Sequence, residues 1–559
     1  MKCHILLAAV VGLVLGGAAR GAEYDLIVRH GKIIDGTGNA WFYGDVGVNV
    51  GKIAAIGDLK DSTSKEVIDA TGMIVAPGFI DVHTHADTDL YTQPTADNFI
   101  RDGVTSIITG NCGYGPLHVG EYFDHLRKHG TAVNVGCLIG HNTVLRAVKG
   151  DRAGDLTDEQ MAKAKGLIQA AMEEGAVGFS TGLIYRPGTY SKTEEIIELA
   201  KVSAERGGIY TSHMRSESME IMAAIDEALR VGREAGCRVE ISHFKLSADA
   251  AKKIGGSDTT LGKVMAARAA GEEVWLDQYP YTASSTSIST MLPDDFLAVG
   301  EKEAIKKIAA DPKIEDVIVE QMRQQYEVQR GRKHLGYVVI ASCEKHPEYN
   351  GRNLIEVAQM MKLAKAGKQP ELLGDGAEKL PEVNVADQCR AAVEIWRDGG
   401  ASCVFHSMLE PDVANIMRNP LVSIASDSGV RQFGVGVPHP RGYGTNTRVL
   451  GVYVREQHVI TLEEAIRKMT SQPALAFRLK DRGSIRVGNW ADMTVFDAAT
   501  VKDMATFEKP HQYPVGIEEV LVNGRVEFAK GEMTKVLAGV PLLGPGYKNQ
   551  SASAAVDQK

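Results

Sequence analysis

Hydrophobic and polar residues alternate in short bursts at both ends of the chain. After Tyr24 the bursts read YDLIVRHGKIID, DVGVNVGKIAAIG and KEVIDATGMIVAPG, with glycines between them. The other end repeats the pattern in GSIRVGNWADMTVFD and EEVLVNGRVEFAKGEMT, where Asn523 and Gly524 suit a hairpin turn. A period of two residues is typical of half-buried strands. The pattern therefore predicts a small β-sandwich domain formed from both termini, residues 23–76 and 480–541.

The middle of the chain has a different rhythm, in which apolar strand-like segments alternate with amphipathic ones. Eight such strand candidates are GFIDVHTHAD, TSIITGNCG, AVNVGCLIGHN, AVGFSTGLIY, IYTSHMRSE, RVEISHFK, EVWLDQYPY and LVSIASDSG. Segments with helical periodicity, such as SKTEEIIELAKVSAERGG, lie between several of them. Eight strands with interleaved helices predict an α/β fold, a (β/α)8 TIM-like barrel, over residues 77–479. The burst ASCVFHSML is a ninth candidate, so one of the nine lies outside the barrel.

Three regions depart from this alternation. Residues 293–380 are rich in charge and follow a predicted strand end, which indicates an inserted lid subdomain. Residues 1–22 contain Lys2, the apolar run ILLAAVVGLVL and then small residues, a pattern typical of a signal peptide. The run is short for a spanning helix, so a retained membrane anchor is the less favoured alternative. We therefore expect an exported protein, periplasmic or secreted, and a flexible tail over residues 542–559.

Composition narrows the class of protein. The 559 residues are 44% hydrophobic and 24% charged, which is typical of a globular protein and excludes a polytopic membrane protein. The net charge is −9, so we expect no nucleic-acid partner, and no membrane association after removal of the leader. One of the seven cysteines lies in the leader, and the other six are far apart. This spacing indicates buried free thiols rather than a disulfide framework.

Residues with metal-binding side chains occur where the predicted barrel strands end. Active sites of this fold lie at the carboxyl ends of the strands. The residues at these ends are His83 and His85, Cys112, His141, His213, His243 and Asp427. Each alone is more often an ordinary core or surface group, but thiolate, imidazole and carboxylate at so many strand ends together favour a zinc site. Three further histidines, His118, His125 and His129, lie in a charged stretch and are interpreted as surface residues.

A succession of motifs resembles a known family. GFIDVHTHAD after a small β unit, with the late SDSG, is similar to the amidohydrolase superfamily of metal-dependent hydrolases. GNCG, STGLIYRPG, YTSHMRSE, ISHFK, YPYTASSTS and HPRGYGT resemble the N-acyl-D-amino-acid deacylases, or D-aminoacylases. The resemblance extends from about Tyr24 to Thr534 and leaves out only the leader and the tail.

The resemblance implies a tight Zn²⁺ site made by Cys112, His213 and His243, with the cysteine where many relatives have a carboxylated lysine. His83, His85 and Asp427 would surround a second, weaker metal position. An independent physical argument supports the first site: a thiolate and two imidazoles leave the fourth tetrahedral position open for water. Zinc lowers the pKa of such a water to about 7, and Asp427 can then act as the general base. The alternative for Asp427 is a purely structural turn in SDSG.

Recognition of an acylated amino acid requires a cation for its free carboxylate. Lys245 lies two residues after His243 on the same predicted strand and could supply that charge. The resemblance adds four substrate-binding residues, Tyr185, Tyr279, Ser285 and Arg441. Two positions depart from the family pattern: Arg186 stands where a second proline is expected, and His406 where phenylalanine is commoner. Both lie near the predicted mouth of the site, and Arg186 weakly suggests acidic substrates.

These observations leave three functional hypotheses. The favoured one is zinc-dependent hydrolysis of N-acyl-D-amino acids, small molecules, to a carboxylate and a free D-amino acid. A related enzyme could act instead on N-acyl-D-glutamate, D-dipeptides or cyclic amides. A non-catalytic binding protein is the third, and it is disfavoured because no ligand type is missing. The pattern leaves the oligomeric state and the number of metal ions open.

Overall fold

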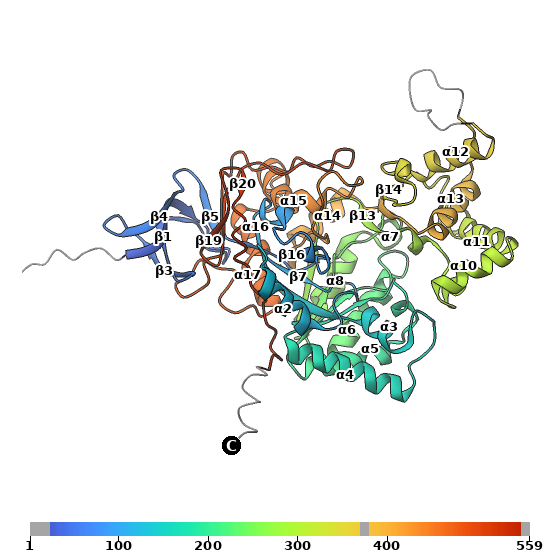
Figure 1. Ribbon diagram of the computed structural model, residues 1–559, viewed down its shortest axis with the longest axis horizontal. Helices are drawn as coiled ribbons and strands as arrows, with labels where there is room; N and C mark the ends of the chain where they lie inside the picture. Colours follow the sequence, from blue (N-terminus) through green and yellow to red (C-terminus); the bar gives the residue numbers. More distant parts are fainter. Residues whose placement is uncertain (1–22, 369–379, 549–559) are drawn as a thin grey trace, which may run out of the picture.

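Both ends of the chain contribute to one sheet of nine strands. The computed structural model describes residues 23–368 and 380–548, so the predicted leader lies outside the described residues. The sheet contains β1 (Glu23–Ile33), β2 (Phe42–Asn49), β3 (Lys52–Gly57), β4 (Thr63–Asp69), β5 (Ile74–Pro77), β17 (Met493–Phe496), β18 (Ile517–Val522), β19 (Arg525–Ala529) and β20 (Glu532–Met533). Its order is β20-β19-β18-β17-β5-β1-β2-β3, and β4 pairs with β1. Antiparallel pairing of β5 with β17 joins the two ends, which lie side by side in Figure 1.

Eight parallel strands form the barrel. They are β6 (Phe79–Asp81), β7 (Val104–Thr109), β8 (Asn134–Gly140), β9 (Gly178–Gly182), β10 (Ile209–His213), β11 (Val239–Ile241), β12 (Val274–Gln278) and β16 (Val422–Ile424). The first and last strands meet just beyond their ends, where the His85 amide donates to the Ser428 carbonyl at 2.9 Å. The predicted TIM-like barrel is therefore confirmed. The ninth candidate burst forms β15 (Ser402–Phe405), which pairs outside the barrel with β13 (Ser284–Ser287) and β14 (Val338–Ser342).

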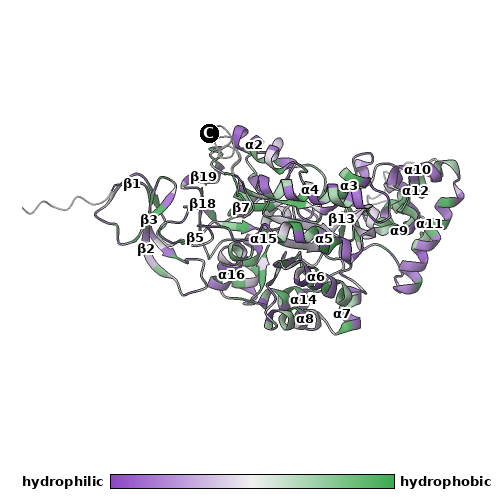
Figure 2. Cartoon of the chain, turned by 90° about the horizontal axis from the view of Figure 1, so that it is seen from below, coloured by the Kyte–Doolittle hydropathy of each residue, from purple (hydrophilic) through white to green (hydrophobic). Residues whose placement is uncertain are grey.

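Helices cover the barrel because one face of each is apolar. In α6, Ile221, Ile225, Ala228 and Leu229 recur at the helical spacing and are buried against the strands. The surrounding helices are α2 (Val119–His129), α3 (His141–Lys149), α4 (Asp158–Glu174), α5 (Thr193–Ala204), α6 (Ile221–Ala235), α7 (Ala248–Ile254), α8 (Ser257–Ala269), α14 (Glu410–Arg418), α15 (Arg441–Arg448), α16 (Leu462–Met469) and α17 (Ser471–Ala476). Figure 2 shows hydrophobic residues along the inner strands and hydrophilic ones on the outer helices. No helix of the described part is long and apolar enough to cross a bilayer.

An insertion lies between β12 and β16 and has a core of its own. It contains the three-stranded sheet, α9 (Asp294–Leu297), α10 (Glu301–Ala310), α11 (Lys313–Arg323), α12 (Leu354–Lys365) and α13 (Val385–Arg397). Buried residues such as Met322, Leu354 and Trp396 form a cluster separate from that of the barrel. The inserted unit extends beyond the predicted limits 293–380, because the short serine-rich β13 and the strand β15 belong to it.

The start of the predicted flexible tail is fixed on the barrel. The Leu542 amide donates to the Val135 carbonyl at 2.8 Å, and the Gly544 amide donates to Gly175 at 2.8 Å. Lys548 makes a further backbone hydrogen bond to Glu173 at 2.9 Å. Residues 542–548 are therefore held by backbone pairing, so the predicted flexible tail does not begin at residue 542. Residues 549–559 lie outside the described part of the chain.

Candidate metal centre

Three side chains from distant barrel strands converge at one point. The Cys112 sulfur lies 3.6 Å from His213 Nδ1 and 3.7 Å from His243 Nε2. The two ring nitrogens are 2.8 Å apart. All three residues are nearly inaccessible to solvent. Donor atoms that face one another this closely in a buried site form a pocket for a cation.

Cys112, His243 and Asp427 share an uncommon backbone conformation. Their φ angles are 54°, 37° and 51°, in the left-handed region, which costs a residue with a Cβ about 1–3 kcal/mol. Each lies a few residues beyond the end of a barrel strand, and local hydrogen bonds hold it there. The amide of Asp427 donates to the His83 carbonyl at 2.9 Å, and that of His243 donates to Asp277 Oδ1 at 2.8 Å. These turns, rather than strand alternation, aim the side chains at the site.

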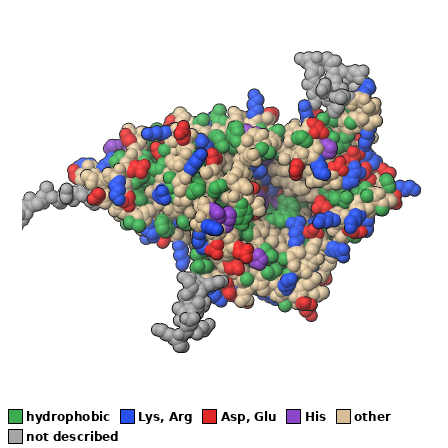
Figure 3. All heavy atoms as spheres, in the orientation of Figure 1, with side chains coloured by type: hydrophobic (Ala, Val, Ile, Leu, Met, Phe, Trp, Pro, Cys, Tyr) green, Lys and Arg blue, Asp and Glu red, His purple; other side chains and the backbone are tan. Residues whose placement is uncertain are grey.

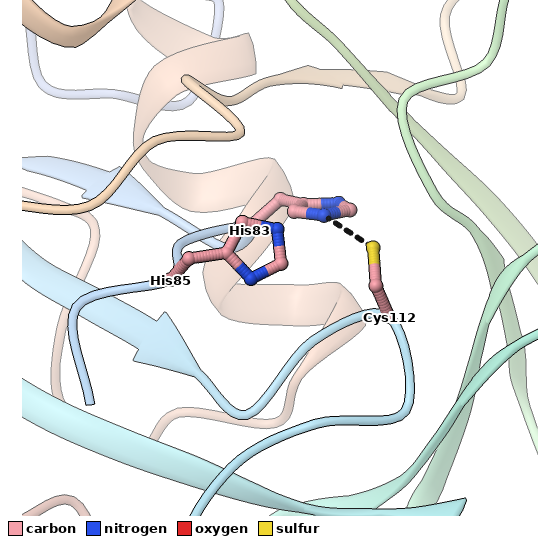
Figure 4. A group of neighbouring side chains, drawn as sticks. All are labelled: His83, His85 and Cys112. Atoms are coloured by element: carbon pink, nitrogen blue, oxygen red, sulfur yellow. Dashed lines mark hydrogen bonds between the residues drawn. The ribbon is translucent and has the colours of Figure 1, made fainter. Parts of the chain in front are cut away.

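His83, His85 and Asp427 form the other half of the cluster. His83 Nε2 is 3.3 Å from the Cys112 sulfur and 3.5 Å from Asp427 Oδ1, and His85 Nε2 is 3.1 Å from the same oxygen. Figure 4 shows the rings of His83 and His85 beside Cys112. His85 is the accessible member, with 36% of its side chain exposed. The Cys112 sulfur is thus shared by two sets of metal-ligand type, one with His213 and His243 and one with His83 and His85.

The local charges favour the ionised forms of the thiol and the carboxyl. Burial alone would raise the pKa of the Cys112 thiol, but His83 and the contact with His213 hold it well below its usual range. Burial also opposes ionisation of Asp427, yet Arg441 and His83 hold the pKa of its carboxyl well below the ordinary value. The surroundings therefore favour the thiolate and the carboxylate, the forms that bind metal ions.

Two carboxylates orient the histidine rings from behind. Asp277 Oδ2 lies 3.0 Å from His83 Nδ1, and Glu217 Oε1 lies 2.8 Å from His243 Nδ1. Histidines that bind metals commonly have such a carboxylate on the other ring nitrogen, which fixes the tautomer. Neither Asp277 nor Glu217 is among the residues predicted from the sequence. Asp277 is the penultimate residue of β12, and Glu217 lies four residues after His213, so their positions near strand ends carried the signal.

The donor set fits a zinc ion. With Zn–S of about 2.3 Å and Zn–N of about 2.0 Å, a tetrahedral site places sulfur and nitrogen about 3.5 Å apart. The two observed separations, 3.6 and 3.7 Å, agree with this value. To bind zinc, the separation between His213 Nδ1 and His243 Nε2 needs to increase from 2.8 Å to about 3.3 Å. A thiolate and imidazoles match the ligand preferences of Zn²⁺.

Comparison with known proteins shows to which family this chain belongs. The sequence pattern of the amidohydrolase family matches residues 66–528. A D-aminoacylase of Alcaligenes xylosoxydans xylosoxydans is 35% identical, over 92% of this chain and 97% of that protein. The chain belongs to the amidohydrolase family. Together with the solved structures, this relative confirms the predicted resemblance to the D-aminoacylases.

Two further relatives support this assignment. The N-acyl-D-glutamate deacylase of the same organism is 35% identical, over 90% of this chain and 94% of that protein. A structure of the N-acyl-D-glutamate deacylase from Bordetella bronchiseptica, complexed with zinc and a phosphonate inhibitor, matches with a TM-score of 0.77 and 33% identity. The match covers 93% of this chain and all of that one. The chain is therefore an amide-hydrolysing enzyme.

The amidohydrolase site places the predicted substrate-binding residues around the cluster. The Arg441 guanidinium is 2.8 Å from Asp427 Oδ2 and lies 4.6 Å above the ring of Tyr279, which is itself buried. The Tyr185 hydroxyl lies 2.9 Å from Thr286 Oγ1 of the insertion. Ser285 lies on β13, and its carbonyl accepts from Arg441 at 3.3 Å. Barrel and insertion therefore both line the cavity beside the cluster, and Figure 3 shows the surface hollowed between them.

Lys245 is less free than its position suggested. Strand β11 ends at Ile241, so strand alternation does not place Lys245. Its ammonium pairs with Glu217 Oε1 at 2.5 Å and lies 2.9 Å from His243 Nδ1. The charge of Lys245 is therefore already balanced, and together with the nearby His243 ring it holds the pKa of the Glu217 carboxyl well below its usual range, against the effect of burial.

Three other residues have roles that differ from the sequence-based expectation. His141 opens α3 after β8 has ended; it belongs to none of the metal-ligand sets of the described residues, and its ring packs edge-on against Phe179. Arg186 pairs with Asp294 at 2.7 Å and donates to two insertion carbonyls, so it joins the barrel to the insertion. The ring of His406 packs edge-on against Phe507 at 4.7 Å.

The carboxylate behind His83 gives a testable prediction. Asp277→Asn should weaken zinc binding at the second position, beside His83 and His85, by about 10- to 100-fold, because the amide cannot fix the His83 tautomer as a carboxylate does. Competition of the variant with a zinc-sensitive dye measures the change. Zinc affinity equal to that of the wild type would show that Asp277 has no part in holding the ring.

Proposed function

We propose that this amidohydrolase is an exported zinc enzyme that hydrolyses the amide bond of N-acyl-D-amino acids to a carboxylate and a free D-amino acid. The observation that carries the proposal is the convergence of Cys112, His213 and His243 beside Asp427. The names of the relatives, a D-aminoacylase and an N-acyl-D-glutamate deacylase, support the substrate class. The zinc in the Bordetella bronchiseptica structure supports the metal.

One tight metal site and a weaker second one are proposed. Cys112, His213 and His243 would hold the first ion, because they are buried and their donor atoms face one another. His83, His85 and Asp427 would surround the second. The partial exposure of His85 supports a lower affinity there, since water competes with an exposed ligand. The shared Cys112 sulfur supports contact with both ions.

The residues of the chain then perform the following roles. Asp427, held ionised by Arg441, accepts a proton from water and returns it to the departing amine nitrogen. Its low pKa makes it a weak base, so the water must be unusually acidic. Bound Zn²⁺ would supply that acidity and would polarise the amide carbonyl. Tyr185, Tyr279, Ser285 and Lys245 would shape the pocket for the amino-acid part.

Export and the small-molecule partner complete the proposal. The apolar run after Lys2 supports a cleaved leader and a periplasmic or secreted enzyme. The cleft between barrel and insertion has a volume of about 750 Å³, within the range of small-molecule sites. A net charge of −9 supports the absence of a nucleic-acid partner.

A kinetic screen tests the proposed function. In zinc-replete buffer, N-acetyl-D-leucine and N-acetyl-D-glutamate should be hydrolysed at least about 100-fold faster than their L forms, as expected for a site in which stereochemistry decides the placement of the reacting carbonyl. A chelator should abolish the activity, and added Zn²⁺ should restore it. Release of the free amino acid is the readout.

The same screen distinguishes the alternatives. Preference for L substrates or for cyclic amides would refute the proposal. Preference for N-acetyl-D-glutamate or for a D-dipeptide would keep the zinc amidohydrolase and change its substrate. The involvement of Arg186 with Asp294 removes the earlier reason to favour acidic side chains. Protein that holds less than about half a zinc per chain and hydrolyses none of these amides would indicate a binding protein instead.

A further inference from the structure

A pair of histidines lies on the outer helix α2. His125 and His129 are one helical turn apart, with ring centroids separated by 4.3 Å and ring planes 28° from parallel. In the described part of the chain, four pairs of histidine rings have centroids within 5.5 Å, and the other three belong to the metal cluster. Both residues of the α2 pair lie outside the two cavities that border that cluster. The pair is therefore a second place where two imidazoles face each other.

Both rings are open to ligands from solvent. His125 is half-buried and His129 is exposed, and Figure 2 shows α2 at the outer edge of the molecule. Within residues 23–368 and 380–548, no group forms a hydrogen bond or an ion pair with either ring. Tyr91 contacts the His125 ring edge-on, with centroids 4.3 Å apart. The ring nitrogens of both histidines are therefore without a polar partner in this part of the chain.

The inner face of α2 fixes the backbone that carries the pair. Tyr122, Phe123 and Leu126 are almost completely buried in the core of the barrel. Residues four apart on a helix lie on the same face, so the fold places His125 and His129 side by side before a ligand arrives. Two histidines at this spacing can bind one metal ion, because both rings reach the same side of the helix. This preorganisation lowers the entropy cost of binding.

The separation of the rings fits a shared metal ion. Two imidazoles bound to one ion through bonds of about 2.0 Å have their ring centroids about 5 Å apart. The observed 4.3 Å equals the separation of the His213 and His243 rings in the metal centre. Side-chain rotation can supply the small difference, since no hydrogen bond from the described residues holds either α2 ring. A dication can therefore bind without a change in the backbone.

The charges around the pair also favour a dication. Partial burial, His129 and Lys128 all lower the pKa of the His125 ring. A neutral ring keeps the lone pair that binds a metal ion. His129 is the last residue of α2, where the negative end of the helix dipole attracts cations. Glu121 is exposed one turn before His125 and adds a carboxylate on the same face.

We propose that His125 and His129 form an accessory site for a divalent transition-metal ion on α2. Imidazole ligands select Zn²⁺, Cu²⁺ and Ni²⁺ over Mg²⁺ and Ca²⁺, and Cu²⁺ should bind most tightly of the three. Water would complete the coordination, because the pair supplies two ligands. The site should therefore be weaker than the one made by Cys112, His213 and His243, and dialysis should empty it first. This inference goes beyond the proposed function and does not depend on it.

Nickel binding to the full chain, without an affinity tag, tests the site. In calorimetry, the zinc-loaded wild type should bind one Ni²⁺ that the double variant His125→Gln, His129→Gln does not bind. Each single variant should weaken this binding at least about 10-fold, because the first histidine holds the ion at a high effective concentration for the second. The comparison isolates the α2 site, since the cluster in the barrel is the same in all these proteins.

His118→Gln is the matched control. His118 is an exposed histidine just before the same helix, and its side chain makes no capping hydrogen bond. This variant should bind Ni²⁺ as the wild type does. Absence of hydrolysis of every N-acyl-D-amino acid would refute the proposed function and leave the nickel result to decide on α2.

A crystal soaked in NiCl₂ locates the ion directly. An anomalous difference peak within bonding distance of a nitrogen of each ring is the expected result. Equal nickel binding by the wild type and the double variant would overturn the inference. A peak at the barrel cluster with none on α2 would overturn it as well.

Discussion

Cys112→Ala should abolish tight zinc binding and, with it, amide hydrolysis. The sulfur is the atom shared by both ligand sets, and without it His213 and His243 alone are a poor zinc site. Metal analysis after dialysis should find less than about one tenth of a zinc per chain, where the wild type should retain at least one. Hydrolysis should stay at background even in zinc-replete buffer.

Cys137→Ala provides the control for loss of a buried thiol. Cys137 lies on β8, is fully buried and is outside the metal-ligand sets, so its variant should retain zinc and activity. Circular dichroism of both variants checks the fold. Stoichiometric zinc in Cys112→Ala would contradict the ligand assignment.

Asp427→Asn should leave zinc largely in place and reduce kcat by about 100-fold or more, the usual range for losing a general base. The amide cannot accept the proton of the attacking water, whereas Cys112, His213 and His243 still hold the tight site. Steady-state kinetics and metal content are measured on the same preparation. Asp294→Asn is the matched control, because Asp294 also pairs with an arginine but lies outside the cluster. The kcat of this variant should change less than about threefold.

Two results would change the role of Asp427. Unchanged turnover would remove it from the mechanism and leave the structural turn as its explanation. Loss of zinc together with loss of rate would make it a metal ligand first. Because Arg441 loses its partner in Asp427→Asn, the double variant with Arg441→Gln shows whether an unpaired guanidinium contributes to the loss.

Much of the architecture could be predicted because the spacing of hydrophobic residues along the chain follows which side chains are buried. Strands such as β7 and β8 are buried at every position of a parallel barrel and therefore appear as mainly apolar segments without charged residues. The turn at Asn523 and Gly524 marked the hairpin of β18 and β19. Periodicity could not assign the burst that became β15, since an apolar strand has the same pattern in either sheet.

The metal-binding residues of the site could be predicted from the sequence, whereas the residues that support them could not. Cys112, His213 and His243 have chemistry that ordinary strands do not need, so their positions at strand ends were informative. Asp277 and Glu217 are acidic residues of a common kind, and only their distances to the rings of His83 and His243 reveal their part. Lys245 was correctly placed near His243, but its partner Glu217 could not be inferred.

By itself, the order of residues along this chain determined a barrel flanked by a composite sheet, and it supplied the metal-binding side chains. The tertiary structure decided which donors meet, because the turns at Cys112, His243 and Asp427 leave the regular strand geometry. It also decided which charges pair across the molecule, such as Arg186 with Asp294 and Arg441 with Asp427. Pairing of charges depends on distances between residues far apart in sequence, and local patterns of hydrophobicity carry no record of those distances.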